Sequence, residues 1–197
     1  DIAANFLSGI LMAFRKPLQI GDHVETNDYT GPVLKINMRT TSLRTFQGQE
    51  VMIPNKDVFN SPIINYTKRG ERRVDLVVGV SYGDDLEKVE QLVLDTIQDL
   101  QGVDKGQDIR LEYTEFGDSS INFRLSFWLE DIKQKSYMQT RSGAIKAIKV
   151  AFDNNDITIP FPIRTLDFGI KGGQTYTEAF TNAYVKTHPN GAGKEGK

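Results

Sequence analysis

The 197-residue sequence lacks the residue types that usually mark metal centres and nucleic-acid binders. It contains no cysteine, which excludes disulfides and thiolate zinc sites and leaves the redox compartment open. Its only histidines, His23 and His188, are too few and too far apart to form a histidine metal cluster. The net charge of -2 lacks the basic excess that is typical of nucleic-acid binders. We therefore expect no metal, no other cofactor and no nucleic-acid partner.

Catalytic motifs are lacking as well. The sequence has no GxGxxG, no P-loop and no HExxH. Ser119 or Ser120 could act as a nucleophile only with a histidine base nearby, and the sequence places none there. Asp84 and Asp85 are better explained as a helix N-cap than as an acid–base pair, since neighbouring residues of a helix point in different directions. The sequence thus predicts that the chain is not an enzyme.

No apolar run is long enough to cross a bilayer. The longest, Ile2 to Phe14, would form a helix of roughly 20 Å, whereas a spanning helix needs about 20 apolar residues. Its basic residues, Arg15 and Lys16, follow it, whereas a secretory signal carries them in front. Pro17 is expected to end the helix. Because the sequence does not begin with Met, we expect a piece of a longer protein, with any spanning helices upstream.

Small residues recur along this predicted helix. Asn5, Gly9 and Ala13 are spaced by four and therefore share one face. Such a stripe lets helix backbones approach closely in a membrane-embedded bundle. Arg15 and Lys16 would then mark the boundary between lipid and water. The alternative is an ordinary buried helix of a soluble core, and the residues alone leave both interpretations open.

Residues 18–67 are predicted to form a small all-β domain. Short stretches of alternating polarity are separated by turn residues, with Val33, Leu43 and Phe46 among the inward-facing candidates. One helical turn is expected before the last strand. Five short strands in about fifty residues favour a small closed barrel, because closure removes exposed sheet edges.

Residues 68–170 show the order β-α-β-β-α-β. We expect strands at 72–82, 109–116 and 119–129, helices at 84–100 and 134–156, and a terminal strand that includes Leu166 and Phe168. This order is the ferredoxin-like arrangement. The first helix should bury Leu86, Val89, Val93, Ile97 and Leu100, and the second should bury Met138, the stem of Arg141, Ile145, Ile148 and Phe152. Residues 171–197 are expected to be a poorly structured tail.

A basic cluster at 68–73 joins the two predicted domains. One interpretation is an RNA contact with aromatic residues for stacking beside a ferredoxin-like sheet. However, Phe123, Leu125 and Phe127 alternate on one strand, and such a face usually packs under helices. A solvated junction, or a patch lining an aqueous cavity that concentrates anions, fits this pattern better.

Several ordered motifs resemble the C-terminal part of small-conductance mechanosensitive (MscS) channels. They are NFLSGILMAFRKPLQIGDHV, GPVLKINMRTTSLRT, VMIPNKDVFNSPIINYT, VGVSYGDDLEKV, GDSSINFRLSFW and IPFP. Together they cover about residues 1–169 in the family's order. The resemblance implies a mixed fold in four parts: the second half of the last transmembrane helix at 1–17, an Sm-like β domain at 18–67, a ferredoxin-like domain at 68–170 and a tail at 171–197.

The resemblance also implies a function. Family members are homoheptamers of the cytoplasmic (inner) membrane that open under tension and release ions and small osmolytes, so we expect self-association and contact with the lipid bilayer. Asn5 and Gly9 match family positions in the last membrane helix. Leu166 and Phe168 would join a sevenfold barrel, and gate residues would lie upstream of this sequence.

The cytoplasmic domains of seven copies would enclose a vestibule with side portals. Lys68, Arg69 and Asp75 are the candidates for its walls. The alternative is a soluble ligand- or RNA-binding module built from a small barrel and a ferredoxin-like domain.

Overall fold

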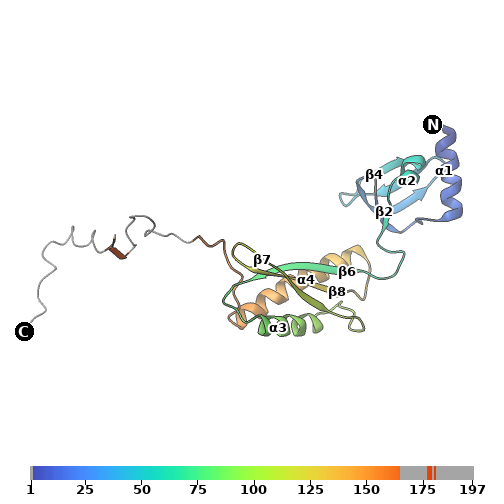
Figure 1. Cartoon of the computed structure of the whole chain (residues 1–197). Helices are drawn as coiled ribbons and strands as arrows, with labels where there is room; N and C mark the ends of the chain where they lie inside the picture. The colour runs from blue at the N-terminus through green and yellow to red at the C-terminus, as the bar shows by residue number, and fades with distance from the viewer. Residues whose placement is uncertain (1, 165–176, 179, 181–197) are drawn as a thin grey trace, which may run out of the picture. The chain divides into compact units, whose positions relative to one another are not determined.

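A computed structural model describes residues 2–164, 177, 178 and 180 (Figure 1). The chain divides into two units, Asp1–Pro160 and Phe161–Lys197. All named helices and strands of the described residues lie in the first unit. Its first half contains α1 (Ile2–Arg15), β1 (His23–Thr26), β2 (Tyr29–Ile36), β3 (Thr40–Arg44), β4 (Glu50–Pro54), α2 (Asn55–Asn60) and β5 (Ile64–Asn65). Its second half contains β6 (Arg73–Val80), α3 (Leu86–Gln98), β7 (Arg110–Phe116), β8 (Ile121–Trp128) and α4 (Gln134–Asn154).

The five strands β1 to β5 form one antiparallel sheet in the order β4-β3-β2-β1-β5. We call these strands, with α2, the β domain. Val33 and Leu43 are opposite each other in β2 and β3 and are buried, as predicted. Phe46 was wrongly predicted to face inward, and its side chain is 65% exposed. The reason is that β3 ends at Arg44, so the alternation does not continue into the turn that holds Phe46.

Helix α1 packs on the β domain through one side only. Its buried residues are Ser8, Gly9 and Met12, and Met12 joins the same core as Val33 and Leu43. The helix ends where Lys16 takes a φ of 46° and donates its N–H to the carbonyl of Met12 over 2.8 Å. The proline that follows at position 17 cannot continue the helix.

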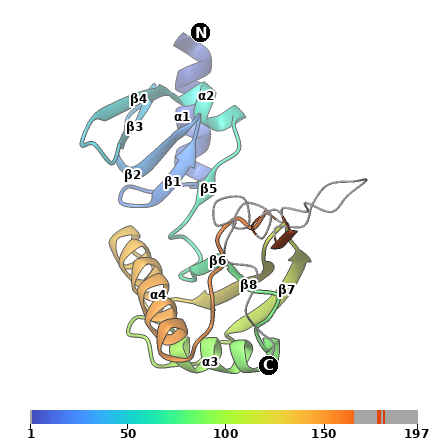
Figure 2. The same ribbon diagram turned by 90° about the vertical axis from the view of Figure 1, so that its left-hand side faces the viewer.

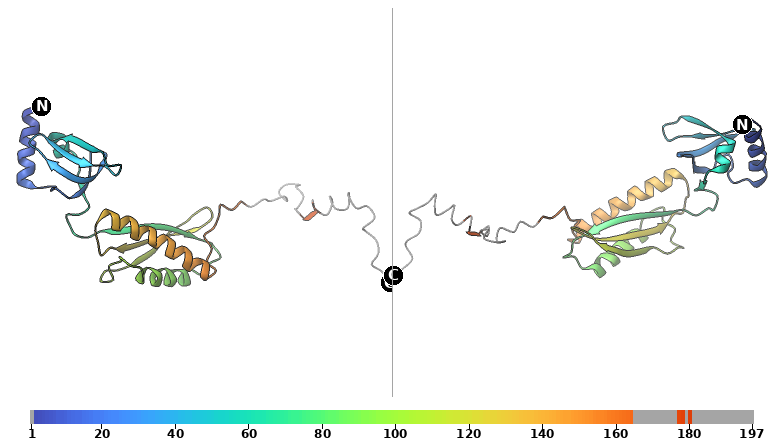
Figure 3. Two further views of the ribbon diagram at one scale, coloured as in Figure 1. Left: turned by 180° about the vertical axis from the view of Figure 1, so that it is seen from behind. Right: turned by 45° about the horizontal axis from the view of Figure 1, so that its top comes forward.

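The strands β6 to β8 form a second antiparallel sheet, in the order β6-β8-β7. Helices α3 and α4 lie beside this sheet, as Figures 2 and 3 show from three directions. We call these elements the α/β domain. Its core contains alternate residues of the sheet and one stripe from each helix: Val74, Leu76, Val80, Phe123, Leu125, Phe127, Val89, Val93, Ile97, Ala144, Ile148 and Phe152. The other face of the sheet carries exposed residues, Asp75 and Val77 among them.

The predicted face of α3 is confirmed, because Val89, Val93 and Ile97 are fully buried. Its N-cap is Asp85, whose carboxylate accepts from the backbone N–H groups of Glu87 and Lys88. A carboxylate there satisfies N–H groups that have no partner inside the helix.

The predicted face of α4 is partly wrong. The buried residues are Thr140, Ala144, Ile148 and Phe152, whereas Met138 is 54% exposed and Ile145 is 48% exposed. The predicted and observed stripes share Ile148 and Phe152, and they differ only before Ile148. There Thr140 and Ala144 face the core, and Met138 and Ile145 do not.

The predicted terminal strand with Leu166 and Phe168 lies outside the described residues, as does nearly all of 171–197. Closure of the first sheet into a barrel and the four domain boundaries stay predictions. Among the described residues, none of the helices combines the length and the apolar character needed to cross a membrane.

Candidate functional site

The seam between α1 and the β domain is built around a glycine. A Cβ atom on Gly9 would lie only 2.4 Å from the carbonyl oxygen of Met38 and 2.7 Å from the side-chain nitrogen of Asn55. Real Cβ atoms do not approach other atoms so closely, so this position of α1 depends on the missing side chain. The glycine therefore brings the helix backbone directly onto the turn between β2 and β3.

Asn55 holds that turn in place from below. Its side chain is fully buried. Its Oδ1 accepts a hydrogen bond from the hydroxyl of Thr41 over 2.9 Å, and its Nδ2 donates to the carbonyl of Asn37 over 2.9 Å. Its backbone N–H donates to the carbonyl of Arg39, also over 2.9 Å. One amide side chain thus fixes the start of α2, strand β3 and the turn under Gly9.

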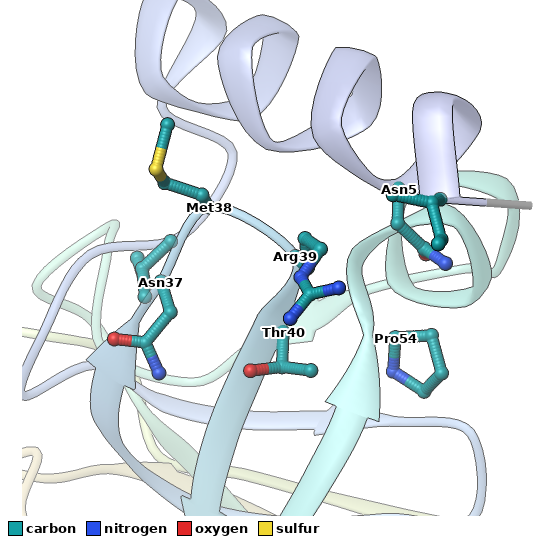
Figure 4. Close-up of a pocket in the computed structure, with 8 residues that line it drawn as sticks. Asn5, Asn37, Met38, Arg39, Thr40 and Pro54 are labelled. Carbon is teal, nitrogen blue, oxygen red and sulfur yellow. The ribbon is translucent and has the colours of Figure 1, made fainter.

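Asn5 ties α1 to α2. The first residue before α2 is Pro54, whose side chain offers no cap to the helix. Instead the Oδ1 of Asn5 accepts a hydrogen bond from the backbone N–H of Lys56 over 2.9 Å. In Figure 4, Asn5 lies on α1 above the end of β4, close to Pro54. The cap of one helix therefore comes from another helix about fifty residues away in sequence.

The cap leads to a first prediction. Asn5→Ala should raise the hydrogen-exchange rate of the Lys56 amide about fivefold, because a lost N-cap costs about 1 kcal/mol. Asn5→Asp should exchange at the original rate, since its carboxylate still accepts from the amide. The measurement is NMR hydrogen exchange of Lys56 in the native state. Equal exchange in Asn5→Ala and the parent chain would show that the bond carries no energy.

Two grooves run along α1 beside the β2–β3 turn. The larger has a volume of about 810 Å³ and is lined by Ile2, Asn5, Ile36, Asn37, Met38, Arg39, Thr40 and Pro54 (Figure 4). The smaller, of about 210 Å³, is lined by Phe6, Gly9, Ile10, Ala13, Ile36, Asn37 and Met38. The stripe predicted from spacing is thus divided: Asn5 and Gly9 face the β domain, while Ala13 is exposed at the smaller groove.

The outer side of α1 is apolar and exposed. Large apolar side chains lie open along the whole helix: Ile2, Phe6, Leu7, Ile10 and Phe14. Phe14 is 83% exposed, and Arg15 and Lys16 follow it, also exposed. A continuous apolar face of this kind marks a surface that meets a protein partner or a membrane.

Two family profiles match the chain. The profile described as the β-domain of mechanosensitive ion channels matches residues 1–68, and that of the MscS C-terminal region matches residues 74–159. The chain belongs to the MscS family of mechanosensitive ion channels. Membership of this channel family confirms the resemblance drawn from the motifs and the prediction that the chain is not an enzyme.

Individual relatives agree. The small-conductance mechanosensitive channel of Helicobacter pylori is 36% identical over 173 residues, which are 87% of this chain and 61% of that protein. An MscS family protein of Archaeoglobus fulgidus is 34% identical over 168 residues, 85% of this chain and 58% of that protein. This MscS-family chain therefore spans about three fifths of these curated relatives.

Solved structures show the same fold. The crystal structure of H. pylori MscS in the closed state matches with a TM-score of 0.79 at 35% identity, over 87% of this chain and 66% of that one. The cryo-EM structure of Arabidopsis thaliana MSL1 matches with a TM-score of 0.70 at 19% identity, over 82% of this chain and 59% of that one. The second likeness concerns the fold alone.

The basic residues at 68–73 of the MscS-family chain lie in different local surroundings. The Nζ of Lys68 donates to the carbonyl of Lys16 over 2.8 Å, at the C-terminal end of α1, where the helix dipole favours a cation. Arg69 is exposed in the linker between the two domains. Arg72, the residue immediately before β6, is buried.

Asp75 lies on the exposed face of β6. Its carboxylate contacts the Nε of Arg73 at 3.1 Å and accepts from the hydroxyl of Ser126 over 2.6 Å. The structure therefore places Asp75 with Arg73 and Ser126.

The alternating apolar residues of β8 do not form a surface on which RNA bases could stack. Phe123, Leu125 and Phe127 are fully buried under the helices, as the alternation predicted, so the two phenylalanine rings cannot reach a base. Within the described part of the chain, no group of three or more histidine or acidic residues could hold a metal ion.

His23 is a buried titratable residue, and the sequence pattern did not indicate its burial. Its ring lies 5.9 Å from the rings of both Phe46 and Tyr66. Burial lowers the pKa of His23 below its ordinary value, and the positive charge of Arg72 lowers it further. The folded chain thus favours the neutral ring.

This shift predicts a loss of stability in acid. Because the pKa of His23 is lower in the folded than in the unfolded state, the unfolded state binds more protons as the pH falls through the unfolded value of about 6.5. The free energy of unfolding should therefore fall with decreasing pH, by at most about 1.4 kcal/mol per pH unit from this one group. Urea unfolding between pH 7.5 and 5 measures it. His23→Phe should flatten the pH dependence of the free energy of unfolding, and His188→Gln should leave it unchanged. The reverse result would contradict the assignment to His23.

Proposed function

We propose that this chain forms the membrane-proximal helix and the cytoplasmic vestibule of a tension-gated channel that releases ions and small osmolytes under hypo-osmotic stress. The observation that carries the proposal is the two-sided character of α1. One side is locked to the β domain by Gly9 and Asn5, and the other presents a continuous apolar surface. A helix of this kind transmits movement between a membrane and a folded domain.

The membrane supplies the driving force. A channel whose open state occupies more membrane area is favoured by tension, which shifts a two-state equilibrium. In this proposal the apolar side of α1 contacts membrane helices or lipid, and Arg15 and Lys16 meet headgroups at the inner surface of the cytoplasmic membrane. Asn5 and Gly9 then connect the membrane part to the β domain, and the exposed Ala13 lets a membrane helix approach closely.

The soluble part forms the wall of the vestibule. The proposal assigns residues 18–67 to an Sm-like barrel, 68–170 to a ferredoxin-like domain and Leu166 with Phe168 to a terminal barrel of seven copies. The strand order β6-β8-β7, with α3 and α4 packed beside that sheet, supports the ferredoxin-like assignment. The partners are six further copies of the chain, the lipid bilayer and the permeating solutes.

The decisive experiment uses the intact parent protein in liposome patches. Suction should activate currents in a graded, reversible manner, and the protein purified in detergent should have seven times the mass of one chain by light scattering. Patches that stay silent up to the rupture tension, with the protein present in the membrane, would refute the channel function. A monomeric mass would refute the assembly.

A charge reversal tests the proposed vestibule wall. Asp75→Lys in the intact channel should raise the anion-to-cation permeability ratio at least about twofold, because fixed charge at a solute path sets the local ion concentration. The matched control is Asp153→Lys, the same charge change on α4, where Asp153 pairs with Lys149 on an exposed surface. Reversal potentials in a salt gradient measure the ratio. Identical potentials for Asp75→Lys and the parent would remove Asp75 from the proposed wall.

A further inference from the structure

Arg72 occupies an unusual position at the end of the linker between the two domains. Its side chain is only 8% exposed. Buried arginines are normally paired with a carboxylate, because an unpaired buried charge is costly. The described partners of Arg72 are instead all neutral, which indicates that its position serves a purpose other than an ion pair.

The guanidinium lies between two aromatic rings. Its central carbon is 5.0 Å from the ring centroid of Tyr66 and 4.3 Å from that of Tyr137. Its N–H groups donate to residues at the start of α4. Nη1 donates to the carbonyl of Ile132 over 3.1 Å, and Nη2 donates to the side-chain oxygen of Gln134. Planar stacking and forked donation are both specific to arginine.

The two rings belong to different domains. Tyr137 is in the first turn of α4. Tyr66 follows β5 and is anchored in the β domain, because its hydroxyl donates to Glu25 over 2.6 Å and its backbone N–H donates to the carbonyl of His23 over 2.9 Å. Contacts therefore run without a break from β1, through Tyr66 and Arg72, to α4.

The linker between these contacts is short and open. Lys68, Arg69, Gly70 and Glu71 are all exposed, and Gly70 has a φ of 74°, a conformation that glycine adopts without strain. The stretch itself thus offers little that would hold the two domains at a fixed angle. The contact of the Arg72 guanidinium with Tyr66 joins the two ends of this linker.

We propose that Arg72 is a clasp that fixes the β domain relative to the α/β domain, so that a displacement of α1 and the β domain is passed on to α4 and does not dissipate in the linker. This role is a property of the chain itself and is measurable without any channel activity. Failure of the channel proposal and failure of the clasp are therefore distinguishable.

The test measures the spread of interdomain distances in the full chain. Because the sequence contains no cysteine, Gln47→Cys on the exposed β3–β4 turn and Gln98→Cys on the exposed side of α3 provide one spin label in each domain. Labelled chains are diluted with unlabelled ones, so that labels in different copies do not contribute. Pulsed electron–electron double resonance then gives the distribution of distances between the two labels.

Arg72→Lys should broaden this distribution about twofold, because lysine keeps the charge but has neither the planar face nor the fork. The matched control is the neighbouring Arg73→Lys. Arg73 also lies over a ring, that of Trp128 at 5.8 Å, but it is exposed and its described contacts are within the α/β domain. It should leave the width unchanged.

A second variant removes the contact of Arg72 with the β domain. Tyr66→Leu removes the β-domain ring and leaves the contacts of Arg72 with α4 in place, so it should broaden the distribution as well. If circular dichroism shows that Arg72→Lys is unfolded, the distance distribution of Tyr66→Leu alone tests the proposal. A width equal to that of the parent chain in every folded variant of the pair would overturn the proposal.

Discussion

Asn55→Ala is expected to lower the free energy of unfolding of the β domain by about 3 kcal/mol. The substitution leaves the buried hydroxyl of Thr41 without its acceptor, and it removes the donor from the carbonyl of Asn37, a residue of the exposed β2–β3 turn. Each buried group that loses its hydrogen bond costs about 1–3 kcal/mol, and the truncation also leaves a cavity. Urea unfolding followed through the amide NMR signals of β2 and β3 measures the loss.

The same short helix supplies a control. Asn60→Ala changes an exposed residue at the other end of α2 and should cost no more than about 0.5 kcal/mol. A double-mutant cycle sharpens the test: Thr41→Val should be costly in the parent chain and nearly neutral in the Asn55→Ala background, because the hydroxyl has already lost its partner. If Asn55→Ala costs as little as Asn60→Ala, the buried amide is not the link between α2, β3 and the turn.

Much of the fold could be predicted because periodicity reports burial directly. Val89, Val93 and Ile97 are four apart and share one helix face, and no other face of α3 carries as many apolar residues. Val33 and Leu43 lie in strands whose alternation leaves a single inward choice. In α4 the pattern failed, since the more apolar stripe through Met138 and Ile145 is exposed and Thr140 and Ala144 face the core instead.

The candidate site could be predicted only in part, because its key contacts join residues far apart in sequence. The spacing of Asn5 and Gly9 shows that they share one helix face, but it does not identify the residues that this face contacts. The burial of Asn55 depends on Thr41 and Asn37, fourteen and eighteen residues away. Arg72 looks like any other member of the basic cluster at 68–73, and only its rings in space distinguish it.

Gly9→Ala is expected to displace α1 from the β domain. The added Cβ would meet the Met38 carbonyl at 2.4 Å. That backbone cannot yield easily, because the carbonyls on either side of it, those of Asn37 and Arg39, are bonded to Asn55. Overpacking of this kind costs about 1–3 kcal/mol, so the equilibrium between docked and detached helix should shift by about tenfold or more. Hydrogen exchange of the Lys56 amide, which is capped from α1, measures the shift.

Gly143→Ala is the matched control, because it makes the same change inside another helix. A Cβ there would find only the Leu100 side chain, at an ordinary 3.7 Å, so the substitution should stabilise α4 by about 0.5–1 kcal/mol through the higher helix propensity of alanine. Opposite signs for the two variants would show that Gly9 is selected for contact and not for flexibility. In the intact parent channel, Gly9→Ala should then change the threshold tension or the rate of inactivation while Gly143→Ala leaves both unaltered. Displacement of α1 in the chain without any effect on gating would separate the seam from the channel's mechanism.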